Sequence, residues 1–139
     1  MIEFKVPGPP MGKQRPIVTR KGAFTPKKTV NYENYVKELY IINKLPKLEG
    51  YLSMSVMAYY PIPKSTSKKR REQMLKGIVL PDKKPDIDNV LKCICDALNK
   101  IAYDDDKQII SMFIAKYYSE NPCTIIRLDK ISREEDKDV

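Results

Sequence analysis

The chain has 139 residues, of which 26 are Lys or Arg and 18 are Asp or Glu, so its formal charge at neutral pH is +8. This is the length of one ordinary domain, and the absence of histidine excludes Ser-His-Asp and Cys-His nucleophile systems, histidine-bound zinc and an imidazole general base. The positive charge favours a nucleic acid or an anionic membrane as partner. No apolar run approaches the ~20 residues of a membrane span, and the three cysteines follow no secretory signal, so we expect a soluble, cytoplasmic protein with reduced thiols.

The N-terminal segment is predicted to form a strand followed by a basic arm. Residues 2–6 alternate apolar and charged side chains, as a half-buried strand does, and a Pro-Gly-Pro-Pro run ends the strand. Residues 11–28 contain no acid and six cations, namely Lys13, Arg15, Arg20, Lys21, Lys27 and Lys28. This segment is either an arm that contacts phosphates, with Lys13 and Arg15 as DNA-binding residues, or a solvated loop or hairpin around Lys21-Gly22.

Residues 29–60 are predicted to form a helix and a second strand. A helix is expected over residues 29–43, capped by Thr29 or Asn31. Its apolar face would consist of Tyr32, Tyr35, Val36, Leu39 and Ile42. Residues 51–60 alternate as a strand, and the following prolines end it.

A second basic segment, residues 64–84, has eight cations and two acids. A short helix from Lys68 to Lys76 is expected there, with Met74 and Leu75 facing inward. Its cap would be Ser65, Thr66 or Ser67. Such a charge run is often only a solvated face, but we favour DNA contact by Lys68, Lys69, Arg70, Arg71, Lys83 and Lys84.

Residues 83–108 combine a strongly amphipathic helix with several carboxylates. The expected core stripe of the helix is Ile87, Leu91, Ile94, Leu98 and Ile101. Beside it, Asp88, Lys92 and Asp96 are successive i, i+4 neighbours on a polar stripe, and Asp86 precedes the helix. Cys93 and Cys95, two positions apart, are expected to point away from each other and not to form a zinc half-site.

The carboxylates suit a hard divalent cation. Oxygen ligands without histidine or thiolate favour Mg²⁺ or Mn²⁺, and Asp86 and Asp88 are spaced to share one ion. Residues 104–106 follow the helix C-terminus and would approach Asp86 only if the next strand runs back along the helix. Alternatively, Asp86 or Asp88 only caps the helix, Lys92 only forms an i, i+4 ion pair, and residues 104–106 are a polar turn.

The C-terminal part is predicted to contain two strands, over residues 109–118 and 123–128, joined by a turn at Asn121-Pro122. The expected fold class is α/β (α+β), a small mixed β-sheet packed by two main helices in one domain, residues 1–130. Residues 131–139 lack apolar periodicity and are expected to form a charged, flexible tail.

Two motif blocks resemble those of the RusA family of Holliday junction resolvases, which prophages and bacteriophages typically carry. The first is Pro9-Pro10-x-Gly12-Lys13-x-Arg15-Pro16, after the first strand. The second is Asp86-x-Asp88-Asn89-x-x-Lys92, followed by Asp96-Ala97-Leu98 and by Asp105-Asp106-x-Gln108. The resemblance covers nearly the whole chain.

This resemblance implies a homodimer that binds four-way branched DNA and nicks two strands symmetrically, with Mg²⁺ or Mn²⁺, in DNA recombination and repair. It implies that Asp86, Asp88 and Asp106 bind metal and that Lys92 is the catalytic lysine. Three consecutive aspartates leave the register between Asp105 and Asp106 open, and counting back from Gln108 favours Asp106. The competing interpretations are a Mg²⁺-dependent nuclease for other branched DNA, such as flaps, and a non-catalytic basic DNA-binding module.

Overall fold

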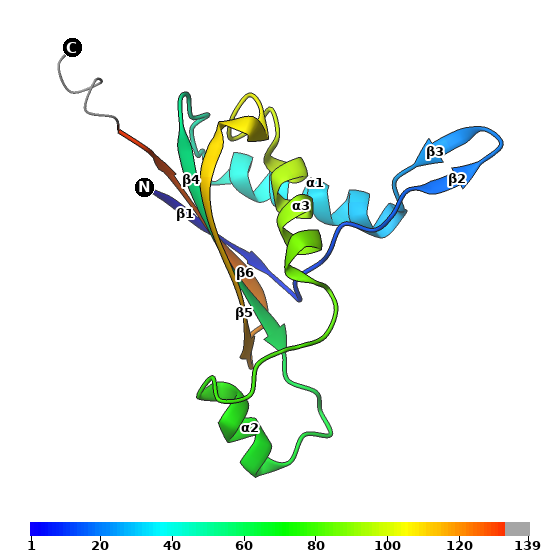
Figure 1. Cartoon of the computed structure of the whole chain (residues 1–139), viewed down its shortest axis with the longest axis vertical. Coiled ribbons are helices and arrows are strands. Elements are labelled where there is room, and N and C mark those ends of the chain that lie inside the picture. The colour runs from blue at the N-terminus through cyan, green and yellow to red at the C-terminus, as the bar shows by residue number, and fades with distance from the viewer. Residues whose placement is uncertain (133–139) are drawn as a thin grey trace.

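A mixed four-stranded sheet organises the chain, and helices α1 and α3 pack on one of its faces (Figure 1). The computed structural model describes residues 1–132. In chain order the elements are β1 (Ile2–Pro7), β2 (Ile17–Thr19), β3 (Gly22–Phe24), α1 (Lys27–Ile42), β4 (Leu52–Pro61), α2 (Lys68–Leu75), α3 (Ile87–Leu98), the 3-10 helix η1 (Asp106–Gln108), β5 (Ile109–Ser119) and β6 (Cys123–Lys130). The predicted fold class, a small α+β fold with a mixed sheet, is confirmed.

The strand order is β1-β6-β4-β5, with β4 and β5 parallel and the other neighbours antiparallel. Parallel neighbours cannot be joined by a tight turn and need a long crossover. Here the crossover contains α2 and α3. The acidic segment predicted to carry the chemistry is therefore the connection that lies across the sheet.

The predicted alternation of the second strand is confirmed, because Leu52, Met54, Val56 and Ala58 are all buried. They pack with buried residues of β1, β6, α1 and α3 into one core, in which Tyr40, Tyr103, Ile94, Leu98, Ile126 and Leu128 are among the largest fully buried side chains. At about 25 cal/mol per Å² of apolar surface, this burial is the main term that holds α1 and α3 on the sheet.

Helix α1 was predicted correctly in extent but not in its cap or its whole face. Residue 26, a proline, occupies the N-cap position, so the expected cap at Thr29 or Asn31 is wrong. The buried residues are Thr29, Tyr32, Val36 and Tyr40, whereas Tyr35 and Ile42 are exposed. The polar Thr29 belongs to the buried face because its hydroxyl exchanges hydrogen bonds with Gln14, at 3.2 and 3.3 Å.

The other two helices also bury a different set of residues than their patterns predict. In α2, Ser67 is the cap, accepting from the Arg70 N–H at 3.3 Å, and Met74 is buried as expected, but Leu75 is exposed. In α3 the buried residues are Val90, Cys93, Ile94, Cys95, Ala97 and Leu98. Its first residue, Ile87, is exposed, and Ile101 lies beyond the helix end. The buried face is wider because α3 packs against both the sheet and α1, so that both cysteines are buried.

The C-terminal strands form as predicted, and the chain stays attached to the sheet after them. The Ile131 N–H donates to the Tyr51 carbonyl at 2.8 Å. Most of the tail predicted at residues 131–139 lies outside the described residues. Among residues 1–132, no helix has the length and apolar character needed to cross a membrane.

Candidate active site

The two motif blocks predicted from the sequence are in direct contact. A Cβ atom at Gly12 would lie 2.8 Å from the Pro85 Cβ and 3.1 Å from the Asn89 Cβ, so this position has room only for glycine. The Lys13 N–H donates to the Asn89 carbonyl at 2.9 Å. The loop after β1 is thereby fixed on the N-terminal end of α3.

An open cavity of about 640 Å³ lies at this contact. Its lining comes from the loop after β1 and from the segment that leads into α3, and it includes Arg15, Lys84 and Asp86. Lys13 also belongs to the lining, so one carboxylate and three cationic residues border a depression that is accessible to solvent. Asp88, on the first turn of α3, is exposed but is not among the residues that line the cavity.

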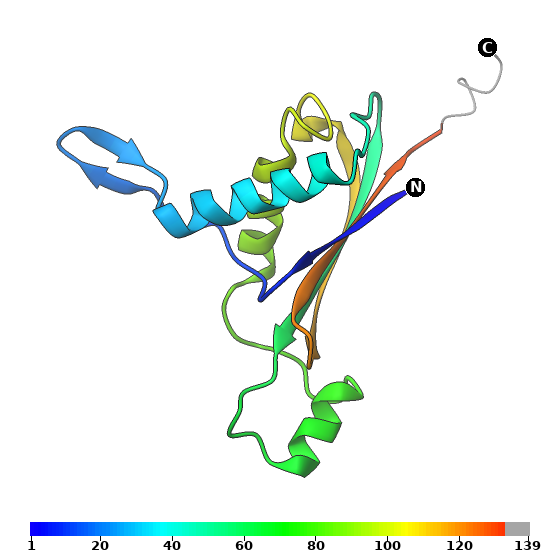
Figure 2. The ribbon, with the colours of Figure 1, turned by 180° about the vertical axis from the view of Figure 1, so that it is seen from behind.

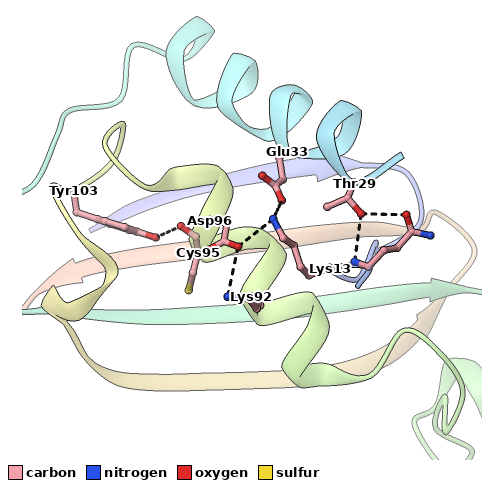
Figure 3. A network of polar contacts seen from close by, with 8 residues as sticks. Lys13, Thr29, Glu33, Lys92, Cys95, Asp96 and Tyr103 are labelled. Atoms are coloured by element: carbon pink, nitrogen blue, oxygen red, sulfur yellow. Dashed lines mark hydrogen bonds and ion pairs between the residues drawn. The ribbon is translucent and has the colours of Figure 1, made fainter. Parts of the chain in front are cut away.

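The ammonium group of Lys13 is held by two carboxylates (Figure 3). Its Nζ lies 2.6 Å from Glu33 of α1 and 3.2 Å from Asp96 of α3, and its side chain is 17% exposed. Burial by itself would lower the pKa of Lys13, but the ion pairs with Glu33 and Asp96 outweigh it and raise the pKa above 10.5. Although no acid is near Lys13 in the sequence, the fold places one carboxylate from α1 and one from α3 next to it. Lys13 therefore links the loop after β1 to both helices and does not project into solvent.

Asp96 is shared between Lys13 and the predicted catalytic lysine. The Nζ of Lys92 lies 3.8 Å from the Asp96 carboxylate, the predicted i, i+4 contact, and the Lys92 side chain is 65% exposed. An ion pair so open to water contributes at most about 1 kcal/mol. The ammonium of Lys92 therefore lies next to Asp96 and remains accessible to solvent.

The three aspartates of the turn after α3 make different contacts. Asp104 pairs with Lys47 at 2.6 Å, which lowers its pKa. Asp105 caps η1 by accepting from the Lys107 N–H at 2.9 Å, and this hydrogen bond lowers its pKa. The Gln108 side chain accepts from the N–H groups of Asp104 and Asp105, which completes a capping box.

Asp106 is exposed, and its pKa is raised by partial desolvation, by a hydrogen bond with Asp105 and by the charge of Asp96. Lys92 opposes this shift. The turn therefore places Asp106 near the middle and end of α3, within the electrostatic range of Lys92 and Asp96.

Asp86 and Asp88 lie at the N-terminal start of α3, and Asp106 lies in the turn that follows its C-terminal end, before strand β5 runs back past α3 (Figure 1). Within residues 1–132 no group of three or more Cys, Asp or Glu residues is arranged to hold a metal ion. The predicted catalytic residues are thus distributed over α3, the residue before it and the turn after it, with Asp106 within electrostatic range of Lys92.

Residues 7–129 match the family model described as Endodeoxyribonuclease RusA. The chain belongs to this family. It is also 37% identical over 139 residues to a protein of Bacillus subtilis (strain 168) named "Uncharacterized protein YqaN", covering 94% of this chain and 97% of that protein. Membership in the RusA family indicates an endodeoxyribonuclease, an enzyme that cleaves DNA within a strand.

Two residues of the sheet hold the segment before α3 in this RusA-family protein. The Tyr60 hydroxyl donates to the Pro85 carbonyl, and Lys116 donates to the Lys83 carbonyl at 2.6 Å while its Nζ lies 5.0 Å from the centre of the Tyr60 ring. Burial, with a smaller effect of Asp86, raises the pKa of Tyr60 to about 12. Sequence reasoning missed Tyr60, Lys116 and Glu33 as parts of the site. The one available signal was a lysine on the otherwise apolar, helix-facing side of β5.

Of the eight predicted DNA-binding cations, four lie on helix α2, and three, Lys13, Arg15 and Lys84, line the cavity. The β2–β3 hairpin projects to the side, beyond the start of α1, and α2 lies at the lower end of the molecule (Figures 1 and 2). On α2, Lys68, Lys69 and Arg70 are exposed, and Arg71 pairs with Glu120 at 3.5 Å. Lys83 and Lys84, also exposed, lie between the two projections. The predicted cations thus flank Asp86 and Asp88.

Proposed function

We propose that this RusA-family protein resolves Holliday junctions, cutting two strands of a four-way DNA junction by paired symmetric nicks in recombination and repair, and that it depends on Mg²⁺ or Mn²⁺. The observation that carries the proposal is the cavity in which Asp86 lies with Arg15 and Lys84, where the two motif blocks touch. This geometry supports a phosphodiester as substrate, since cations for the phosphate and a carboxylate for the chemistry border the same space.

The donor set fits a hard cation. Asp86 and Asp88 are exposed, two residues apart, and bring oxygen ligands only, and Mg²⁺ is commonly bound by one or two carboxylates together with waters and substrate phosphate. When bound, the ion would supply an activated water and neutralise charge on the phosphate. We assign Asp86 and Asp88 as its first ligands and retain Asp106 as the third predicted ligand.

The remaining residues have roles that follow from their charges. Arg15 and Lys84 would hold the phosphate at the cavity against the repulsion of the aspartates. Lys92, open to water on one side, would stabilise the negative charge that develops on the phosphate in the transition state. We prefer Asp106 to Asp105 as the third metal ligand because the Asp105 side chain is already engaged as the cap of η1.

Two symmetric nicks require two active sites, so we propose a homodimer as the active form. The basic β2–β3 hairpin and the basic helix α2 project from the molecule in different directions, which suits DNA arms that leave a branch point in different directions (Figures 1 and 2). This proposal of a four-way junction substrate rests on family membership and on charge.

The decisive experiment is cleavage of a labelled synthetic four-way junction with Mg²⁺ and with EDTA, beside a panel of flap and linear DNAs. We expect symmetric nicks in the junction that require the metal. Asp86→Asn should abolish cleavage while binding is retained or tightened, because a repulsive charge is removed. Cleavage by Asp86→Asn at the wild-type rate would refute the metal assignment, and preferred cleavage of flaps would replace the junction as substrate.

A further inference from the structure

The β2–β3 hairpin stands apart from the core as a two-stranded sheet of its own (Figures 1 and 2). Its turn is ordered by Thr19, whose hydroxyl accepts from the Lys21 N–H at 3.2 Å and donates to the Gly22 carbonyl at 3.3 Å. Every residue from 14 to 24 is exposed. An isolated two-stranded hairpin is only marginally stable in water, so a bound partner would add to its order.

The hairpin nevertheless presents large apolar side chains. Ile17 and Phe24 are directly opposite each other in the strand register and therefore lie on the same face. Phe24 is 51% exposed and Val18, on the other face, is 79% exposed. Ile17, Val18 and Phe24 are thus exposed together on one short basic arm, where they are available to an apolar group of a partner.

The positive charge around this apolar pair indicates the chemical class of the partner. Residues 4–32 contain no acid, and Arg15, Arg20, Lys21, Lys27 and Lys28 lie on the hairpin or next to it. A partner that is both polyanionic and rich in flat apolar surface is a nucleic acid with unstacked bases. Aromatic side chains stack on such bases whatever their sequence.

The position of the hairpin relates it to the proposed cleavage site. Arg15 lines the cavity that contains Asp86, and β2 begins two residues later at Ile17. If a phosphate binds in this cavity, the neighbouring nucleotide would lie close to the root of the hairpin. In an intact duplex the base faces are hidden by stacking, whereas at a branch point they are accessible.

We propose that the β2–β3 hairpin is a base-contacting arm that stacks Phe24 and Ile17 on an unstacked base at the branch point, next to the cleaved phosphate. The arm gives the protein its preference for branched over linear DNA. This inference rests on the proposed function and adds to it the element that recognises the branch.

The test is the ratio of affinities for a synthetic four-way junction and a linear duplex of the same sequence, measured in EDTA with the full chain. Phe24→Ala should weaken junction binding about fivefold or more, the low end for one lost base stack, and change duplex binding less than twofold. Phe24→Trp, which keeps an aromatic ring for stacking, should keep the preference for the junction over the duplex. A 2-aminopurine at the branch point should change its fluorescence with the wild type and lose most of that change with Phe24→Ala.

Phe113→Ala is the matched control, because Phe113 is 54% exposed and lies on β5, away from the hairpin. It should leave the affinity ratio unchanged. If the wild type prefers junctions and Phe24→Ala keeps that preference, the proposed role of the hairpin is refuted while the junction substrate is not. An equal loss of affinity for junction and duplex would have the same meaning. A change in oligomeric state with Phe24→Ala would show that a second copy of the chain is the partner. Equal binding of both DNAs by the wild type would overturn the junction proposal together with the arm.

Discussion

Replacing Lys13 by Met tests whether this lysine is a structural joint or a DNA contact. The change keeps the length of the side chain and removes its charge, leaving Glu33 and Asp96 without their shared cation (Figure 3). Hydrogen bonds to charged groups contribute about 1.5 to 3 kcal/mol, and breaking a fully buried pair costs about 3 to 5 kcal/mol. Since Asp96 is 30% exposed, we expect a loss of about 2 to 3 kcal/mol in the free energy of unfolding.

Urea titration at neutral pH measures this loss, with Lys28→Met, a change at an exposed lysine of the same basic segment, as the control. The control should stay within about 0.5 kcal/mol of the wild type. Because the pKa of Lys13 is raised, its contribution is present in full below the unfolded value of 10.5 and is lost only as the pH rises through the folded value. The difference between Lys13→Met and the wild type should therefore persist unchanged to about pH 9.

DNA binding supplies the second measurement. With its charge already neutralised by two carboxylates, Lys13 should release few counterions, so Lys13→Met should leave the slope of log affinity against log salt nearly unchanged. Arg15→Gln, at the exposed neighbour that lines the cavity, should reduce that slope by about 1. The structural role of Lys13 is refuted if Lys13→Met is as stable as Lys28→Met and reduces the slope of log affinity against log salt as Arg15→Gln does.

Three further changes examine the rest of the site. Gly12→Ala places a methyl 2.8 Å from the Pro85 side chain, so thermal unfolding should show a loss of about 1 to 3 kcal/mol, and wild-type stability would contradict the close contact. Asp106→Asn should abolish junction cleavage in Mg²⁺. Asp105→Asn should leave folding intact and reduce cleavage far less, because asparagine is also a good helix cap. If Asp105→Asn instead causes the larger loss of cleavage, Asp105 is the metal ligand. Arg70→Gln on the exposed face of α2 should weaken binding to all DNAs alike and lower the salt slope by about 1, and an unchanged slope would place α2 outside the DNA contact.

The sequence was most informative where local chemistry decides the outcome. Alternation identified β4 because each inward side chain packs on the same core, and Ser67 was among the three caps predicted for α2 because hydroxyls satisfy free N–H groups at helix starts. It was least informative about helix faces. Tyr35 and Ile87 fit an apolar stripe but are exposed, because the directions from which the sheet and the neighbouring helix pack are not encoded in the periodicity of one helix.

The residue types of the site follow from the sequence, since histidine is absent and Asp86, Asp88 and Lys92 stand at fixed positions on and before one helix. Which charges meet was decided by tertiary structure. Lys13 stands in an acid-free segment, yet the fold surrounds it with Glu33 and Asp96, 20 and 83 residues away. Asp106 lies beyond the C-terminal end of α3 in sequence, yet the turn brings it within electrostatic range of Lys92 and Asp96 inside that helix. Electrostatic interactions depend on distance through space, and chain packing alone sets that distance.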